Sequence, residues 1–345
     1  MSQTPQPFKR ALFTISRETE FFSEGELTKQ IGVVKPLWPL AVLKELVDNA
    51  LDASEQGDVP PAVSVRFMDD HFQVEDNGPG IPERVITDSL NYAVRVSDKV
   101  RYVGPTRGQQ GNGLKTVWAA PFVASADRVG VVEVATRGVL YRVTVRADPL
   151  KGRPRLDLDK EPSDRTTGAA VRVRWPGLGR MLDLAGNRLV TLARNWVGGY
   201  AIFNPHARFS LRCGDSVIEH PPPTNPGWEK WRADRPSSPG WYTHAQLHDL
   251  VAGLLEADGD EGKTTVRELI GTFAGLTATA KQKRVYEQAG LRGPLLRDMV
   301  RGDDIDAQDL ARLHLAMKEH SKPVPPANLG LVGKAHLLAL QRVFR

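Results

Sequence analysis

The chain has 345 residues, of which 41% are hydrophobic and 25% are charged, and these proportions exclude a disordered chain. The 46 Lys and Arg residues outnumber the 41 Asp and Glu residues, and the resulting charge of +5 permits contact with nucleic acid but does not require it. The single cysteine, Cys213, excludes a disulfide framework and a multi-cysteine zinc site, and no apolar run approaches the roughly 20 residues that cross a bilayer.

Residues 1–10 lack the apolar region of a signal peptide. We therefore expect a cytoplasmic protein, with association with the nucleoid as an option, and no membrane partner.

Residues 1–35 are interpreted as an N-terminal arm, and residues 36–219 are expected to form the first domain. The apolar spacing and the turn residues predict the elements of this domain in chain order. Helices are expected at 36–54, from the turn at 76–82 to about Arg95, from about Gly113 and at 181–201; strands are expected at 62–67, 72–75, within 129–147, at 169–175, 208–212 and 216–218. The predicted fold is α+β, with helices on one face of a mostly antiparallel sheet.

Residues 220–241 contain six prolines, which cannot continue a helix or a central strand, and are interpreted as a linker. Residues 242–322 show helical spacing and almost no strand signal, so we expect a small helical domain there. A second proline-rich break precedes a C-terminal tail at 323–345, which ends in a short helix.

The segment Leu43–Ala53 is the most informative helix. Helical spacing places Leu43, Leu46, Val47, Ala50 and Leu51 on one face and Glu45, Asp48, Asn49 and Asp52 on the opposite face. An Asn amide oxygen suits Mg²⁺, and a Glu one turn away can orient or deprotonate an attacking water. The alternative is an ordinary solvated polar face.

A second motif, VEDNGPGI, ends an apolar-edged strand at Asp76. Asp76 is a candidate acceptor for the exocyclic amino group of a base, and Gly78 and Gly80 would let the backbone approach a ligand closely. An ordinary turn is the alternative.

A third motif, RGQQGNGLKT, has glycines at 108, 111 and 113 that lead into a helix beginning with Leu114, Lys115 and Thr116. Free N–H groups at such a helix start form a phosphate site, although a flexible linker is the alternative. The spacing is not that of a Walker loop. A fourth motif, Thr166–Trp175, gives a Thr-Gly pair that enters a strand.

The order and spacing of these four motifs resemble those of the GHKL ATPases, a family whose nucleotide site has the Bergerat arrangement. Within that family the chain is most similar to the B subunits of topoisomerase VI. The similarity rests on KELVDNALDA, VEDNGPGIP and TRGQQGNG, and it continues through AIFNPHARFSL and the proline linker. It extends into residues 242–322, which resemble a helix-two-turn-helix domain.

This resemblance implies a role for each matching residue. Glu45 would be the general base, Asn49 would ligate Mg²⁺, and Asp76 would bind the adenine amino group with help from Thr167 through water. The remaining contacts to ATP would come from Gly78, Gly80, Ile81, Arg107, Gly108, Gln109, Gln110, Gly111, Asn112, Gly113, Leu114 and Lys115. Lys115 departs from the usual small or apolar residue; it either supplies charge to a phosphate or faces solvent.

The tail also departs from the family pattern. Residues 321–340 resemble only the entrance of the transducer domain that follows in the topoisomerase VI proteins, and its phosphate-sensing lysine has no clear counterpart. Lys115 and Lys334 are the two candidates for a replacement.

The resemblance implies an ATP-gated homodimeric clamp that controls DNA or a DNA-cleaving partner of the topoisomerase VI A kind. The segment KQKR (281–284), together with Arg292, Arg297 and Arg301, is a candidate DNA-backbone contact, with a solvated basic face as the alternative. The alternative function is a nucleotide-gated binding module of a defence or plasmid-maintenance system without topoisomerase activity.

Overall fold

The computed structural model describes residues 19–92, 102–105, 113–148, 153–184, 188–220, 223–231 and 235–341. The helices of the first part are α1 (Thr19–Phe22), α2 (Glu24–Ile31), α3 (Trp38–Gln56), α4 (Glu83–Ser89), α5 (Gly113–Ala124), α6 (Leu178–Leu184) and α7 (Arg188–Phe203). Its strands are β1 (Ala62–Phe67), β2 (His71–Glu75), β3 (Val129–Thr136), β4 (Val139–Asp148), β5 (Arg153–Pro162), β6 (Ala169–Arg174), β7 (Arg208–Cys213) and β8 (Ser216–Glu219). A short 3₁₀ turn, η1 (Lys35–Leu37), leads into α3.

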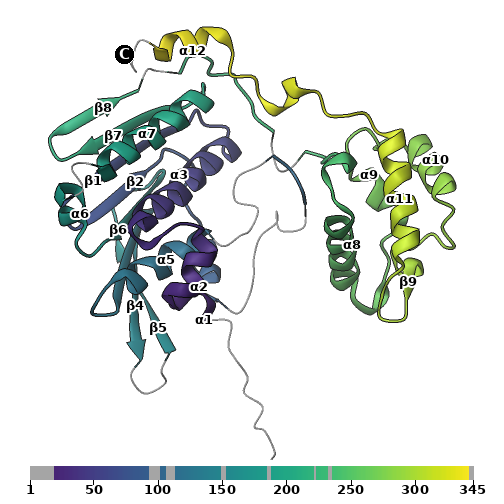
Figure 1. Ribbon diagram of the computed structural model, residues 1–345, viewed down its shortest axis with the longest axis horizontal. Helices are drawn as coiled ribbons and strands as arrows, with labels where there is room; N and C mark the ends of the chain where they lie inside the picture. The colour runs from purple at the N-terminus through teal and green to yellow at the C-terminus, as the bar shows by residue number, and fades with distance from the viewer. Residues whose placement is uncertain are drawn as a thin grey trace, which may run out of the picture.

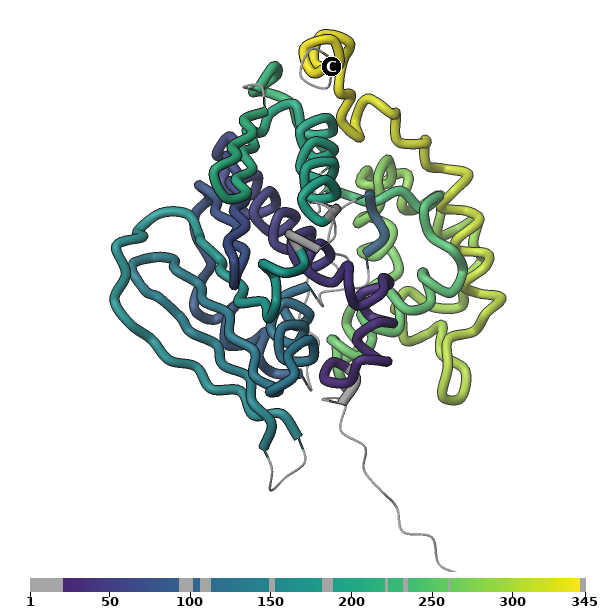
Figure 2. The backbone as a smooth tube through the Cα atoms, turned by 60° about the vertical axis from the view of Figure 1, so that its left-hand side comes forward, coloured from purple at the N-terminus to yellow at the C-terminus, as the bar shows by residue number. Residues whose placement is uncertain are grey.

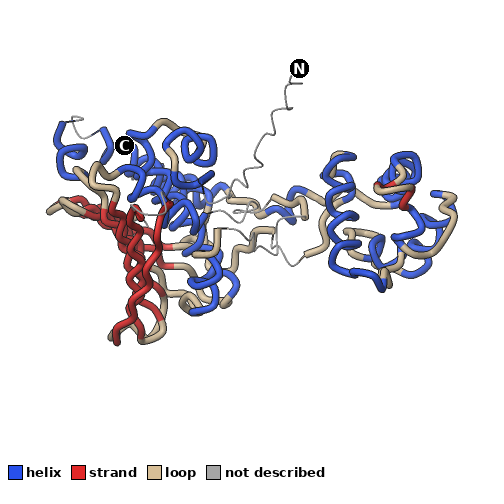
Figure 3. The backbone as a smooth tube through the Cα atoms, turned by 90° about the horizontal axis from the view of Figure 1, so that it is seen from below, coloured by secondary structure: helices blue, strands red, loops and turns tan. Residues whose placement is uncertain are grey.

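Within the described residues, the strands form one eight-stranded sheet in the order β5-β4-β3-β6-β2-β1-β7-β8. Every neighbouring pair is antiparallel except β1 and β7, which run parallel. The helices cover one face of this sheet, as Figure 1 and the view from below in Figure 3 show. The predicted α+β architecture is confirmed.

The core lies between this helix layer and the sheet. The apolar face of α3 is buried there as its spacing predicts, and Trp38 at its start is fully buried. Helix α5 is apolar on nearly all sides, and its Trp118 and Phe122 are also buried. Each large side chain buried in this way contributes about 1.5–3 kcal/mol, so the packing fixes α3 and α5 side by side on the sheet.

Residues 19–31, which we expected to be part of an arm, form the helices α1 and α2. Ser23 caps α2 by accepting from the Glu26 N–H, and Gly32 ends the helix in the left-handed conformation. Phe21 and Phe22 pack against the ring of Tyr92. These residues therefore belong to the first core.

Two other elements differ from the expectation. Helix α4 ends at Ser89, short of Arg95, and residues 93–101 lie outside the described part of the chain. Strand β5 was not predicted, because its sequence RPRLDLDKEP is charged and has little apolar alternation. It lies at the edge of the sheet and pairs with β4 over ten residues, which is a suitable place for an exposed charged strand.

The helical part after the linker has its own apolar core, built around residues such as Leu250, Phe273 and Leu310. Its helices are α8 (His244–Asp258), α9 (Val266–Gly271), α10 (Thr279–Ala289) and α11 (Ala307–His320), with the 3₁₀ turns η2 (Pro239–Trp241), η3 (Gly259–Glu261) and η4 (Leu296–Met299). The expectation of an all-helical region needs a correction, because β9 (Val300–Arg301) and β10 (Asp304–Ile305) form a small antiparallel ladder. Gly302 at φ +61° makes the tight turn between them.

After α11 the chain returns to the first part through η5 (Pro326–Leu329) and α12 (Lys334–Gln341). Figure 2 shows this yellow segment crossing from the helical part to lie above the first domain. His336 fixes α12 there, with its Nε2 atom 2.9 Å from the Ala201 carbonyl oxygen at the end of α7. Of the helices in the described ranges, none is long and apolar enough to cross a membrane.

Candidate functional site

Helix α3 presents Glu45 and Asn49 one turn apart, away from its buried face. The Glu45 side chain is 29% exposed, and Asn49 is exposed. Burial raises the pKa of Glu45, while the Lys44 ammonium, 3.5 Å from Glu45 Oε1, opposes this shift. A carboxylate with a raised pKa and partial access to solvent is suited to accept a proton.

The start of α5 lies directly against Glu45. A Cβ atom added to Gly113 would stand 2.5 Å from Glu45 Oε2, so only glycine leaves this carboxylate in place. Glu45 of the first sequence motif and Gly113 of the third, 68 residues apart in the chain, therefore lie against each other. Gly113 is the last residue of the glycine-rich motif; Arg107, Gly108, Gln109, Gln110, Gly111 and Asn112 lie outside the described residues.

Asp76 follows β2 and is held in the turn by backbone donors. Its Oδ1 atom accepts from the N–H of Gly78 at 2.9 Å and from that of Ala169 at 3.2 Å. The Asp76 N–H in turn donates to the Ala169 carbonyl oxygen at 2.9 Å. Burial raises the pKa of Asp76, and the two backbone N–H groups oppose this shift. The second and fourth motifs therefore meet at this carboxylate.

Three glycines let the backbone segments around Asp76 approach closely. Gly168 donates its N–H to the Gly78 carbonyl oxygen at 2.9 Å. At φ +66°, any Cβ on Gly168 would overlap the Asp76 carbonyl oxygen. Gly80 at φ +77° leaves room for the Thr136 hydroxyl, which a Cβ would approach to 2.5 Å. Gly80 and Gly168 therefore need glycine both for conformation and for space.

Thr136, at the end of β3, joins these loops, and it belongs to none of the four sequence motifs. Its fully buried hydroxyl accepts from the Ile81 N–H at 2.9 Å and donates to the Gly168 carbonyl oxygen at 3.1 Å. Ile81 is thereby held next to Gly80. Thr136 is a polar residue at an inward-facing position of a strand, and this feature of the sequence could have indicated that it makes buried hydrogen bonds.

The remaining predicted residues differ from one another in how exposed they are. Thr167 is exposed beside Gly168, and Leu114 is half-buried against the first core. Lys115 is only 4% exposed, with its Nζ atom 5.7 Å from the centre of the Tyr92 ring, so the interpretation that it faces solvent is wrong. Lys334, the other candidate for a phosphate-sensing lysine, is exposed at the start of α12.

Asp48 does not belong to the solvated polar face on which the helical spacing placed it. It is 5% exposed and accepts from the Tyr200 hydroxyl at 2.7 Å and from the Lys44 ammonium at 2.6 Å. Because Tyr200 comes from α7, this contact joins α7 to the helix that carries Glu45. Asp48 and Tyr200 are far apart in the sequence, so the local spacing of residues does not predict their contact.

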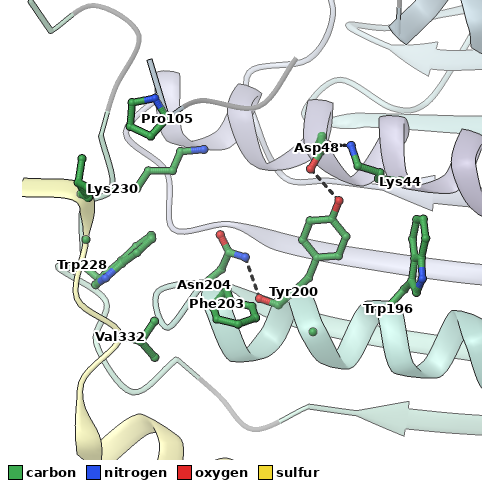
Figure 4. A pocket seen from close by; sticks show the side chains of 13 residues that line it. Lys44, Asp48, Pro105, Trp196, Tyr200, Phe203, Asn204, Trp228, Lys230 and Val332 are labelled. Carbon is green, nitrogen blue, oxygen red and sulfur yellow. Dashed lines mark hydrogen bonds and ion pairs between the residues drawn. The ribbon is translucent and has the colours of Figure 1, made fainter. Parts of the chain in front are cut away.

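A cavity of about 770 Å³ lies on this α7 side of α3. Figure 4 shows the Lys44, Asp48 and Tyr200 contacts on one side of it, and Trp228, Lys230 and Pro105 on the other. Its lining is completed by Trp196, Gly199, Phe203, Asn204, Leu329, Gly330 and Val332. The cavity therefore lies next to the candidate site, and α3, α7, the linker and the returning C-terminal segment all contribute to its wall.

Among the residues that the structure describes, no group of three or more His, Cys, Asp or Glu side chains could hold a metal ion by itself. A divalent cation at Asn49 would therefore need further oxygen ligands from a bound molecule. Mg²⁺ is commonly held in this way, by one or two protein oxygens together with phosphates and water.

Replacing Gly168 by Ala tests the geometry around Asp76. We expect a loss of at least about 2 kcal/mol in unfolding free energy, because the change combines an unfavourable positive φ with displacement of the Asp76 backbone. Gly138→Ala is the matched control: Gly138 has φ +79° but no backbone or side-chain atom closer than 4.0 Å to an added Cβ. Equal losses in denaturant titrations of the two variants would contradict the steric argument.

Comparison with known proteins shows which family and which proteins this part of the chain is similar to. Residues 35–176 match the family described as histidine kinase-, DNA gyrase B- and HSP90-like ATPase. The chain is 30% identical over 223 residues to the B subunit of type 2 DNA topoisomerase 6 from Thermococcus onnurineus, covering 61% of this chain and 37% of that protein. It is 45% identical over 190 residues to the protein of the same name from Archaeoglobus fulgidus, covering 52% and 30%.

The chain thus spans about a third of the length of these curated relatives. Among solved structures, it is similar to the Aquifex aeolicus MutL ATPase domain complexed with ADP, at 16% identity and a TM-score of 0.33, covering 61% of this chain and 67% of that one.

Proposed function

We propose that the chain binds ATP and hydrolyses it with Mg²⁺, in the domain whose residues 35–176 match the histidine kinase-, DNA gyrase B- and HSP90-like ATPase family. The observation that carries this proposal is that the four motifs meet in two pairs: Gly113 lies against Glu45, and Gly168 lies against Asp76. One domain would thereby provide Asp76 for the base of the nucleotide, and Glu45 and Gly113 for its phosphates.

At the base end, Asp76 is the acceptor for the adenine amino group. Because Gly78 and Ala169 both donate to Oδ1, we assign Oδ2 to the ligand. Gly80 and Ile81 would line the adenine, in the arrangement that Thr136 holds, and exposed Thr167 would assist through a water. The raised pKa of Asp76 reflects the cost of burying this charge before a ligand arrives.

At the phosphate end, Glu45 is the general base for water attack on the γ-phosphate. Asn49 fits Mg²⁺ through its exposed amide oxygen, and the ion would neutralise charge on the phosphates. The N–H groups at the start of α5, from Gly113 and Leu114, suit phosphate oxygens, and Arg107–Asn112 would complete the enclosure. Lys115, buried in the first turn of α5, would contribute positive charge there.

We further propose that this ATPase acts as a clamp like the B subunits of topoisomerase VI. The support is the likeness to curated B subunits over 223 and 190 residues. In this proposal, ATP joins two copies across their nucleotide sites, and the closed dimer controls DNA or a cleaving partner of the topoisomerase VI A kind.

The corresponding division of the chain is an ATPase domain at 36–219, a linker at 220–241, a helix-two-turn-helix-like domain at 242–322 and a tail at 323–345. The two separate apolar cores support this division. The basic residues of 281–284, on α10, are the proposed DNA contact, and we propose a cytoplasmic or nucleoid location.

Steady-state ATP hydrolysis by the full chain, at several protein concentrations with Mg²⁺, tests the proposal. We expect a rate that rises faster than linearly with protein concentration, because the active form is a dimer, and that disappears with EDTA. A linear dependence would contradict the clamp and leave the ATPase intact. Failure to bind any adenine nucleotide would overturn the proposed function itself.

A further inference from the structure

The linker segment Trp228–Trp231 contacts α3, the helix that carries Glu45 and Asn49. The Lys230 Nζ atom lies 3.0 Å from Asp52 Oδ1 and 2.6 Å from Glu55 Oε2. The Lys230 side chain is 17% exposed, and the two carboxylates are similarly shielded. Without the Lys230 ammonium, the negative charges of Asp52 and Glu55 would lie close together with less positive charge to balance them. The ion pairs therefore constrain the position of this part of α3 relative to the linker.

Trp228 fixes the same segment to the chain that returns from the helical part. Its indole N–H donates to the Leu331 carbonyl oxygen at 3.0 Å, and a Cβ on Gly330 would approach its ring to 2.6 Å. The ring also lies 4.7 Å from that of His206, whose Nε2 atom is 3.1 Å from Glu55 Oε1. The outgoing and returning connections therefore meet beside α3, at the cavity wall shown in Figure 4.

The other end of the segment contacts the helical part. Trp231 packs edge to face against Trp241 at 4.9 Å between ring centres. Next to it, the Val103 N–H donates to the hydroxyl of Tyr242, a buried residue of the second core, at 2.9 Å. Movement of the helical part would therefore be transmitted to the linker and, through Lys230, to α3.

We propose that Lys230 is a positioning residue of the nucleotide site, through which the linker makes nucleotide affinity depend on the placement of the helical domain. This inference rests on the proposed ATP site. The ion pairs of Lys230 are with Asp52 and Glu55, which follow Asn49 on α3 by three and six residues, so Lys230 is assigned a positioning role and not a catalytic one. Its effect is on the orientation of the helix that presents Glu45 and Asn49.

The first test compares Lys230→Met with Lys230→Arg in the full chain. We expect Lys230→Met to weaken binding of a non-hydrolysable ATP analogue about tenfold and to raise KM by a similar factor, with a smaller change in kcat. Lys230→Arg keeps the positive charge and should restore binding to within about threefold. Lys263→Met, which removes an exposed lysine of the helical part, is the control.

The second test is hydrogen exchange of residues 237–258 with and without the analogue. We expect the analogue to slow exchange there in the wild type and in Lys230→Arg, and to have no such effect in Lys230→Met at saturating analogue. A role for Lys230 in stability alone would lower the melting temperature without removing this nucleotide dependence.

The outcomes separate the inference from the function on which it rests. A wild type that binds no nucleotide would overturn the proposed ATP site. A wild type that binds nucleotide, with Lys230→Met equal to it in affinity and in exchange, would overturn only the role of Lys230. Loss of folding in Lys230→Met alone would leave Lys230→Arg and the wild-type exchange measurement to decide.

Discussion

Glu45→Gln is expected to lower the rate of ATP hydrolysis by at least about 10²-fold while leaving ATP binding nearly unchanged. The amide keeps the size of the side chain and its place against Gly113, but it cannot take a proton from the attacking water. Single-turnover hydrolysis and equilibrium binding, measured on the same preparation, separate the two effects. Glu26→Gln, which changes an exposed acid paired with Lys29, is the control.

The pH dependence of the wild type follows from the burial of Glu45. Because burial raises its pKa, the carboxylate is protonated at a higher pH than an ordinary glutamate, and hydrolysis should fall as the pH decreases through this raised value.

The folded state also binds this proton more tightly than the unfolded state does, so ionised Glu45 opposes folding at neutral pH. Glu45→Gln should therefore melt at a slightly higher temperature than the wild type at pH 7. A Glu45→Gln variant that hydrolyses ATP normally would exclude Glu45 as the base.

The features that the sequence predicted are those carried by local patterns. Alternating apolar residues located β1 at Ala62–Phe67, where the structure has it, and helical spacing located α3 to within two residues at either end. Glycines at 78, 80 and 168 marked the turns around Asp76, because the backbone approaches other atoms closely at all three and Gly80 and Gly168 also have positive φ.

What the sequence did not show are contacts between distant segments. Asp48 was assigned to a solvated face because helical spacing alone cannot show that Tyr200 of α7 covers it. Lys115 was left open between two roles because its burial against Tyr92 depends on where α5 packs. Lys230 has no motif at all, and only the folded chain places it beside Asp52 and Glu55.

Asp76→Asn is expected to change which nucleotide is bound. The N–H groups of Gly78 and Ala169 require an acceptor at the Oδ1 position, so the new amide would direct its oxygen there and its NH₂ group towards the base. An acceptor for the adenine amino group is thereby replaced by a donor. Two donors facing each other without water should weaken ATP binding roughly 10²-fold.

The same geometry predicts a gain for inosine triphosphate, which carries a carbonyl oxygen where adenine carries the amino group. Relative to the wild type, Asp76→Asn should prefer inosine triphosphate over ATP, because its NH₂ group can donate to that oxygen. Competition between the two nucleotides measures this preference, with Asp70→Asn, at an exposed acid of the β1–β2 turn, as the control. Equal losses for both nucleotides would indicate a collapsed site, whereas unchanged ATP binding would show that Asp76 does not contact the base.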